Sequence, residues 1–230
     1  MRKVLVVEDE ESIRELIALH LRLAGYQVQE CGSAERALSL LGSGQRFDAA
    51  ILDVMLPGMN GFSLCESIRK QDGEVGIIIL SAKGMEHDKI RGLSIGADDY
   101  MTKPFSTSEL MARVDALCRR VGRTRSPQEE STQMVSGKFT LDERSRVLYK
   151  QDKAIDLTQV EFQIMQLFFR NSGTALMRET ILEGVWGENY YGDVKIVDVN
   201  IRRLRMKIED EPSQPKHILT VWGYGYRWNG

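Results

Sequence analysis

The sequence predicts an α/β chain of two domains, a doubly wound five-stranded parallel sheet followed by a C-terminal winged helix-turn-helix. Over residues 1–121, short β-branched runs alternate with amphipathic helical patterns, which is typical of a parallel sheet with helices on both faces. Residues 122–133 contain no large apolar side chain, so we place a flexible linker at 122–134. Residues 135–230 combine short strands, three helical patterns and a terminal hairpin, and form the second domain.

The elements of the first domain follow from apolar periodicity. The expected strands are Lys3–Val7, Gln27–Cys31, Ala49–Asp53, Gly76–Ser81 and Asp99–Thr102. The expected helices lie near 11–24, 33–41, 61–71, 85–95 and 106–121. The run 77–80 is apolar at every position, as expected for a strand that is buried on both faces.

The second domain begins with strand patterns at 138–141, 146–149 and 154–157. Thr158 and Glu161 are spaced as a capping box, which predicts the start of a helix at this point. Further helices are expected at 178–185 and 195–210, and a hairpin at 218–222 and 224–228 around Gly223. Three helices followed by a hairpin describe a helix-turn-helix with a wing.

Composition excludes several classes of protein. The 230 residues are 42% hydrophobic and 28% charged, as in an ordinary globular protein. We expect a cytoplasmic protein without a membrane segment, because no apolar run approaches about 20 residues and no signal-peptide layout is present. Cys31, Cys65 and Cys118 lack metal-ligand spacing, which fits a reducing compartment. Residues 1–121 hold 15 basic and 18 acidic residues and 122–230 hold 16 and 15, so any nucleic-acid site depends on local clustering.

Polar side chains stand at the carboxyl ends of four predicted strands. Glu8 and Asp9 follow the first strand, Asp53 ends the third, Ser81 ends the fourth, and Lys103 follows the fifth. Because parallel strands end at one edge of a sheet, we expect these groups to converge. Three carboxylates repel one another, and a hard divalent cation such as Mg²⁺ relieves that repulsion. Taken singly, each residue has an ordinary alternative as a solvated group at a loop.

This set of side chains is suited to phosphoryl transfer. Asp53 would be the carboxylate nucleophile, and Lys103 and Ser81 would hold the oxygens of the phosphoryl group. The expected Mg²⁺ ligands are Glu8 (through water), Asp9, Asp53 and the backbone carbonyl of Met55.

Four motifs of the first domain contain the polar residues at the strand ends. They are Val6-Val7-Glu8-Asp9-Glu10, Ile51-Leu52-Asp53-Val54-Met55-Leu56-Pro57-Gly58, Leu80-Ser81-Ala82 and Lys103-Pro104-Phe105. On these motifs, residues 1–121 resemble a response-regulator receiver domain of the CheY-like fold. The resemblance implies that Asp53 accepts a phosphoryl group from the phosphohistidine of a sensor histidine kinase. It also implies a cis peptide at Lys103-Pro104. Tyr100 would be an aromatic switch that turns inward when Ser81 moves toward the phosphoryl group.

Charged residues of both signs lie on the expected face formed by helix 85–95, strand Asp99–Thr102 and helix 106–121. They are Lys89, Asp98, Asp99, Glu109, Arg113 and Arg120. A solvated surface would explain each of them singly. Resemblance to the OmpR/PhoB subfamily implies instead a symmetric homodimer, formed on phosphorylation, in which three pairs cross the two-fold axis. The pairs would be Lys89 with Glu109, Asp98 with Arg120, and Asp99 with Arg113.

The helical pattern at 195–210 carries a cluster of cations. Val197, Ile201, Leu204 and Ile208 have the spacing of a buried stripe. The expected DNA-contacting residues of this helix are Lys195, Val199, Arg202, Arg203 and Arg205, because cations suit phosphate and guanine and methyl groups suit thymine. Thr220 and Arg227 of the hairpin could reach phosphates. The alternative is a solvated amphipathic helix, which would usually include more Glu.

Three motifs of the second half lie in the expected helix start, the long helix and the hairpin. They are Leu157-Thr158-Gln159-Val160-Glu161-Phe162, Val197-Asp198-Val199-Asn200-Ile201-Arg202-Arg203-Leu204-Arg205 and Thr220-Val221-Trp222-Gly223-Tyr224-Gly225-Tyr226-Arg227. On these motifs, residues 135–230 resemble the winged-helix effector domain of the OmpR/PhoB subfamily. Some relatives have Arg where this chain has Trp222, and Trp cannot act as a cation in a narrow minor groove, so we expect weaker contacts at the wing.

The sequence thus predicts a two-component response regulator and transcription factor. It would bind double-stranded DNA at tandem half-sites as a homodimer, with RNA polymerase as a further candidate partner. It would catalyse only its own phosphoryl transfer and dephosphorylation. The alternative is an aspartate-nucleophile, Mg²⁺-dependent phosphatase, in which a second Asp typically stands two positions after the nucleophile. Met55 occupies that position here. A regulator that binds DNA without phosphorylation is a second alternative, and the complete pocket argues against it.

Overall fold

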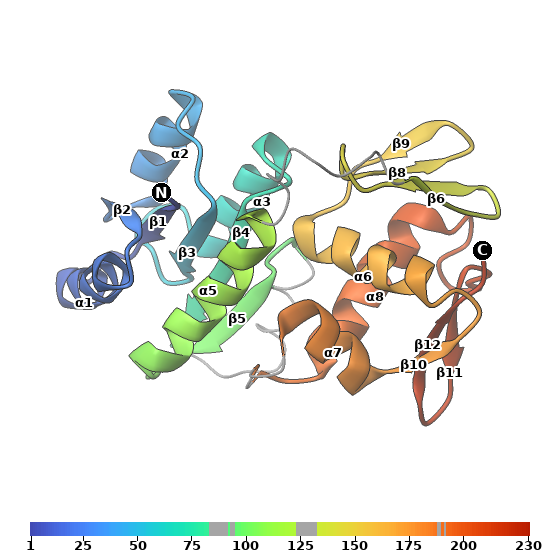
Figure 1. Cartoon of the computed structure of the whole chain (residues 1–230). Coiled ribbons are helices and arrows are strands. Elements are labelled where there is room, and N and C mark those ends of the chain that lie inside the picture. Colours follow the sequence, from blue (N-terminus) through green and yellow to red (C-terminus); the bar gives the residue numbers. More distant parts are fainter. Residues whose placement is uncertain (83–91, 93–94, 123–132, 188–189, 191) are drawn as a thin grey trace. The chain divides into compact units, whose positions relative to one another are not determined.

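The computed structural model describes residues 1–82, 92, 95–122, 133–187, 190 and 192–230, with the side chains of 119–122 excluded. The chain forms two compact units, Met1–Gly122 and Arg123–Gly230 (Figure 1). Among the described residues, no helix is both long enough and apolar enough to cross a membrane.

The first unit contains a five-stranded parallel sheet with the strand order β2-β1-β3-β4-β5 (Figure 1). The strands are β1 (Lys3–Val7), β2 (Gln27–Cys31), β3 (Ala49–Asp53), β4 (Gly76–Ser81) and β5 (Asp99–Thr102). The predicted strands and the doubly wound fold are confirmed. Every residue of β3 and β4 is buried, as their continuous apolar runs indicate.

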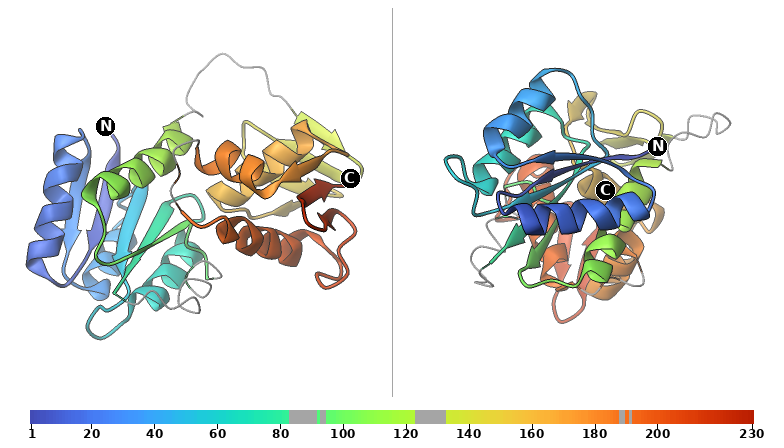
Figure 2. Two further views of the ribbon diagram at one scale, coloured as in Figure 1. Left: turned by 90° about the horizontal axis from the view of Figure 1, so that it is seen from below. Right: turned by 90° about the vertical axis from the view of Figure 1, so that its left-hand side faces the viewer.

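Helices cover both faces of this sheet (Figure 2). They are α1 (Glu11–Leu23), α2 (Ala34–Gly42), α3 (Gly61–Gln71) and α5 (Thr107–Gly122). α1 packs against α5 on one face, and α2 packs against α3 on the other. The side chains of Ser33 and Asn60 accept backbone N–H groups at the starts of α2 and α3, which explains where these helices begin. The helix expected at 85–95 lies outside the described residues except at 92 and 95.

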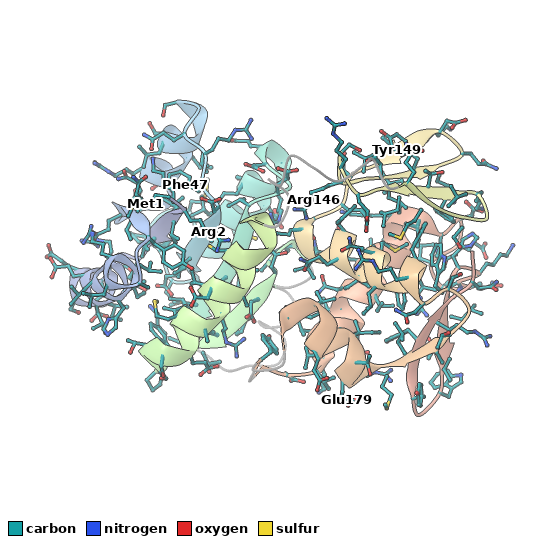
Figure 3. All side chains as sticks on the ribbon, in the orientation of Figure 1. Met1, Arg2, Phe47, Arg146, Tyr149 and Glu179 are labelled. Atoms are coloured by element: carbon teal, nitrogen blue, oxygen red, sulfur yellow. The ribbon has the colours of Figure 1, made fainter. Side chains whose placement is uncertain are left out.

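The second unit begins with a four-stranded antiparallel sheet, β6 (Gln133–Ser136), β7 (Phe139–Asp142), β8 (Val147–Lys150) and β9 (Lys153–Ile155). Strand β6 starts inside the segment 122–134 that was expected to be a linker. It pairs with β7 from Gln133 onward, so its first residues are held by ladder hydrogen bonds. Arg146, labelled in Figure 3, lies in the β7–β8 connection with its guanidinium 5.0 Å from the centroid of the Phe162 ring.

Three helices and a second sheet complete this unit. The helices are α6 (Gln159–Arg170), α7 (Arg178–Trp186) and α8 (Lys195–Ile208), and the sheet has the order β10-β12-β11. Its strands are β10 (Ala175–Met177), β11 (Ile218–Val221) and β12 (Gly225–Trp228), so the winged-helix fold is confirmed. The expectation that the last helix reaches residue 210 is wrong, because Glu209 has extended backbone angles. Strand β10 was not expected. Its three residues are too few to show periodicity.

Candidate functional site

Three carboxylates gather at the carboxyl edge of the parallel sheet. Glu8 and Asp9 follow β1, and Asp53 is the last residue of β3, which pairs directly with β1. Glu8 and Asp53 are buried and Asp9 is exposed, and one oxygen from each lies within 4.8 Å of the others. The predicted convergence of these side chains is therefore present in the structure.

Lys103 joins this cluster from the segment after β5. Its Nζ is 2.6 Å from Glu8 Oε2 and 3.2 Å from Asp53 Oδ1. The Lys103-Pro104 peptide is cis, as the resemblance implied. Burial acts to lower the pKa of Lys103, but the hydrogen bond to Glu8 and the charge of Asp53 outweigh it, so the pKa is raised. Burial also raises the pKa of Glu8, and the charge of Asp53 adds a smaller contribution. The hydrogen bond and charge of Lys103 oppose these effects but do not outweigh the two together.

The donor set and its surplus of negative charge fit Mg²⁺. The side-chain ligand atoms of Glu8, Asp9 and Asp53 are all carboxylate oxygens, which is the ligand type of this hard cation. Asp53 Oδ1 is buried and contacts Lys103 as an ion pair, but it receives no hydrogen bond from the residues that the structure describes. One ammonium shared by two buried carboxylates, with Asp9 beside them, leaves a surplus of negative charge that a second cation would compensate. Glu8, Asp9 and Asp53 are therefore the residues that could hold the metal.

Ser81 and Tyr100 lie near this edge of the sheet. Ser81 is buried at the end of β4, and its carbonyl accepts the Lys103 N–H at 2.7 Å. Tyr100 on β5 is already buried, with 4% of its surface exposed. A Cβ added to Gly92 would lie 3.2 Å from its ring. Tyr100 thus lies inward in this structure, and the expected switch between Ser81 and Tyr100 stays a prediction. The side chain of Met55 is exposed.

Two residues that sequence reasoning missed shape the pocket. Arg14 of α1 donates from Nη1 to the carbonyls of Glu8 at 2.8 Å and Asp9 at 3.2 Å, which fixes the loop that carries both carboxylates. Gly61 begins α3, and a Cβ there would lie 1.9 Å from the backbone oxygen of Asp53. The Pro57-Gly58 turn and the Asn60 cap were visible signals that a helix starts beside the Asp53 backbone.

The charges expected at a dimer face pair mainly within the chain. Arg113 donates to both oxygens of Asp99 at 2.7 Å and from Nη2 to Glu109 at 2.6 Å. The placement of Asp98 on an exposed face is wrong, because its side chain is fully buried. It accepts hydrogen bonds from Arg69 and from the Ile77 N–H. Lys89 and the side chain of Arg120 lie outside the described residues.

The long helix α8 buries the predicted stripe of Val197, Ile201, Leu204 and Ile208. On the opposite side, Lys195 and Arg202 are exposed, Val199 is partly exposed, and Met206 exposes 66% of its surface. This face combines cations with apolar groups, as expected for contacts to phosphates and base edges in a major groove.

Two cations predicted for this face are directed into the domain instead. Arg203 forms an ion pair with Glu161 at 3.0 Å, and its side chain is 10% exposed. The placement of Arg203 on the outward surface is therefore wrong, because a buried carboxylate holds it. Arg205 donates to the carbonyl of Ile218 and to Thr220 Oγ1. The hydroxyl of Thr220, which was expected to reach a phosphate, therefore accepts a hydrogen bond within the domain. Arg227 is exposed on β12.

A polar network joins α8 to its neighbours. Asp198 Oδ1 accepts from Arg178 Nε at 2.8 Å and from the Tyr226 hydroxyl at 2.7 Å. The guanidinium of Arg178 also lies 4.9 Å from the centroid of the Tyr226 ring. Because these contacts link α7, α8 and β12, the exposed face of α8 and the wing are held in one fixed arrangement.

Comparisons with known proteins agree with this organisation. Residues 4–115 match the family of response regulator receiver domains, and residues 152–228 match the family described as transcriptional regulatory protein, C terminal. The response regulator DrrB of Thermotoga maritima, an OmpR/PhoB homologue, is 31% identical, with 100% of both chains covered and a TM-score of 0.53.

Two further structures extend the comparison. A mutant of RitR with one cysteine replaced by aspartate is 27% identical over 100% of both chains, with a TM-score of 0.78. The receiver domain of the Francisella response regulator 1452 is 37% identical over 53% of this chain and 99% of that chain, with a TM-score of 0.50.

The fold and the acidic pocket, taken with these matches, define a receiver domain joined to a DNA-binding domain, which is the organisation of a two-component response regulator. The chain belongs to the OmpR/PhoB family of these regulators. Receiver domains act with sensor histidine kinases, and the C-terminal domain is of a DNA-binding type.

Proposed function

We propose that Asp53 is the phosphoacceptor of this response regulator and that its phosphorylation controls dimerisation and DNA binding. One observation carries the proposal. Asp53 lies buried beside Glu8, within reach of Asp9, and 3.2 Å from the ammonium of Lys103. Its neighbours thus supply both an oxygen-ligand set for Mg²⁺ and a cation for a phosphoryl oxygen.

Each residue of the pocket has a definite role in this proposal. A carboxylate oxygen of Asp53 attacks the phosphorus of a phosphohistidine, the P–N bond breaks, and the imidazole of the kinase leaves with its electron pair and takes a proton from water. Lys103 balances charge on the oxygens of the transferred group. Ser81 offers a hydroxyl to the same oxygens from the end of β4. Glu8 (through water), Asp9, Asp53 and the backbone carbonyl of Met55 would hold Mg²⁺, which would neutralise charge on the carboxylate and phosphoryl oxygens when bound. Arg14 keeps the β1–α1 loop in position through two carbonyls.

Labelled acetyl phosphate tests the pocket. With Mg²⁺, the full chain should retain the phosphoryl label, and Asp53→Asn should retain none because the nucleophile is removed. Asp48→Asn is the matched control, since Asp48 stands at the other end of β3 and binds the Lys3 N–H. Chelation of the metal should also abolish labelling. Label that persists in Asp53→Asn would contradict the proposal.

An aspartate-nucleophile phosphatase is disfavoured by the exposed thioether of Met55, two positions after Asp53, where such an enzyme would need an acid or base. We therefore propose that chemistry at the pocket is limited to the chain's own phosphoryl group. Steady release of phosphate from a small phosphate ester, at a rate that Asp53→Asn abolishes, would favour the phosphatase.

We further propose that Lys195, Val199 and Arg202 of α8 contact DNA in the major groove, with Arg227 on a phosphate. The test is a duplex selected from a random-sequence pool with the phosphorylated chain. Arg202→Ala should weaken binding to that duplex about tenfold, because one base or phosphate contact contributes roughly 1–3 kcal/mol. Arg144→Ala is the control, since Arg144 is exposed in the β7–β8 turn. Equal loss of duplex binding in the two variants would argue against contact of α8 with DNA.

Dimerisation on phosphorylation is proposed for the surface that includes β5 and α5, and RNA polymerase is a further proposed partner. Glu109 supports the first proposal because it is partly exposed beside Arg113 and can exchange partners with a second copy. Sedimentation should show a dimer after phosphorylation and a monomer before it. Glu109→Lys should weaken the dimer, whereas Glu66→Lys on the exposed side of α3 should not. Unchanged assembly of Glu109→Lys would exclude this surface.

A further inference from the structure

Glu161 lies in the first turn of α6, outside the proposed DNA-contacting set, yet it binds two cations of α8. Its side chain is fully buried. Oε1 is 3.0 Å from Arg203 Nη2, and Oε2 is 2.6 Å from Lys207 Nζ. The same Oε2 accepts the Thr158 N–H at 2.8 Å as part of the capping box. One carboxylate therefore closes a helix end and holds two positive side chains.

This contact changes the charge that α8 presents. The helix carries five cations in sequence, Lys195, Arg202, Arg203, Arg205 and Lys207. Glu161 holds Arg203 and Lys207, and the carbonyl of Ile218 holds Arg205. Lys195 and Arg202 remain on the exposed face beside Met206. The outward face of α8 thus presents fewer uncompensated cations than the sequence of the helix contains.

The number of cations that reach DNA phosphates controls sequence-independent affinity. Each neutralised phosphate releases counterions and adds about 0.9 to the slope of log affinity against log salt. A cation that is paired with a buried carboxylate contributes less to that term, because its charge is already balanced. The side chain of Arg203 is also directed inward, whereas that of Lys207 is 33% exposed and donates to the Asp156 carbonyl as well as to Glu161. Removing the carboxylate charge would leave the charges of Arg203 and Lys207 uncompensated by Glu161 and would allow Arg203 to turn toward solvent.

We propose that Glu161 is a specificity-determining residue, which holds Arg203 inward and compensates the charge of the exposed Lys207, and thereby suppresses binding to random sequence. The inference rests on the proposed contact of α8 with DNA. The capping box alone does not require the charge, since Gln at this position can accept the Thr158 N–H equally well. The charge is needed for the two cations.

Glu161→Gln in the full chain tests the inference, because it retains the volume and the cap while it removes the charge. The probe is a 30-base-pair duplex of random sequence, a length of about three helical turns, titrated between about 50 and 200 mM salt. The variant should bind this probe more tightly than wild type at low salt, with a slope steeper by about 1 to 2. Its preference for a selected duplex over the random one should fall accordingly.

The matched control is Glu143→Gln. Glu143 is a carboxylate of the same unit that binds Gln166 and Arg170 of α6, two residues that lie outside α8. It should leave the slope unchanged. Combining Glu161→Gln with Arg203→Gln should reduce the steeper slope again by about 1.

The salt dependence of the variants can overturn the inference in two ways. A folded Glu161→Gln chain with the wild-type slope, or with weaker binding to both duplexes, would overturn the inference. If this variant does not fold, Lys207→Gln in the otherwise wild-type chain replaces it. The inference requires that Lys207→Gln leaves the slope unchanged, and a shallower slope would overturn it. Failure of the wild-type chain to prefer any selected duplex would instead contradict the proposed function of α8.

Discussion

The two units each contain a buried glutamate, and the two glutamates have opposite electrostatic balance. Glu8 shares the ammonium of Lys103 with Asp53, and burial raises its pKa. Glu161 is paired with both Arg203 and Lys207, and these cations outweigh burial and lower its pKa. A buried carboxylate with too little positive charge marks a place where another cation can bind, whereas a balanced one holds elements together.

Arg113→Met should have the largest effect, because it removes the positive charge that compensates the buried carboxylate of Asp99. Asp99 is buried and receives both 2.7 Å bonds from Arg113. Removing one partner of such a pair typically costs about 3–5 kcal/mol. We expect a loss of this size in the free energy of unfolding of the receiver unit, measured by hydrogen exchange of the β1 and β3 amides.

Glu109→Gln is the comparison for this experiment. It breaks a second ion pair of Arg113, but Glu109 is partly exposed, so the loss should stay below about 1 kcal/mol. Similar losses in the two variants would show that burial of the carboxylate is not what decides the cost.

Glu161→Gln should have a smaller effect that depends on pH. The lowered pKa means that the carboxylate contributes stability above its ordinary value of 4.5, and that this contribution is lost as the pH falls through the lower folded value. Charged hydrogen bonds contribute roughly 1.5–3 kcal/mol, so the variant should be less stable than wild type by about that amount at pH 7. The difference should shrink in acid. Thermal unfolding followed by tryptophan fluorescence measures it, and a difference that is constant between pH 7 and acid would contradict the assignment.

Glu8→Gln should have the smallest effect and the opposite sign. Burial of the Glu8 charge, with a smaller contribution from Asp53, raises the pKa of Glu8, so the neutral side chain should stabilise the receiver unit by about 1 kcal/mol at pH 7, while Mg²⁺-dependent labelling of Asp53 falls. Glu10→Gln, a change at an exposed neighbour, should alter neither quantity. A loss of stability in Glu8→Gln would mean that its pair with Lys103 outweighs the effects of burial and of Asp53.

The pocket could be predicted from sequence because topology determines it. Apolar runs specify the strands, and parallel strands bring their carboxyl ends to one edge, so Asp53 and Lys103 had to meet. The direction of Arg203 could not be predicted from the periodicity of its own helix, because its partner lies on another helix. One signal was available: Glu161, Ile164 and Phe168 have the spacing of a single buried stripe, so Glu161 needed a cationic partner. Asp98 gave no such signal, since Arg69 is 29 residues away.

Trp222 provides a built-in optical probe of the wing. Of the three tryptophans, Trp186 and Trp228 are buried, whereas Trp222 is 91% exposed at the hairpin tip. Its emission is therefore that of indole in water, and a dissolved quencher reaches it far more readily than the other two. Differential quenching of the unmodified protein would thus report, without any attached dye, whether the wing tip becomes shielded when a duplex or a second copy binds.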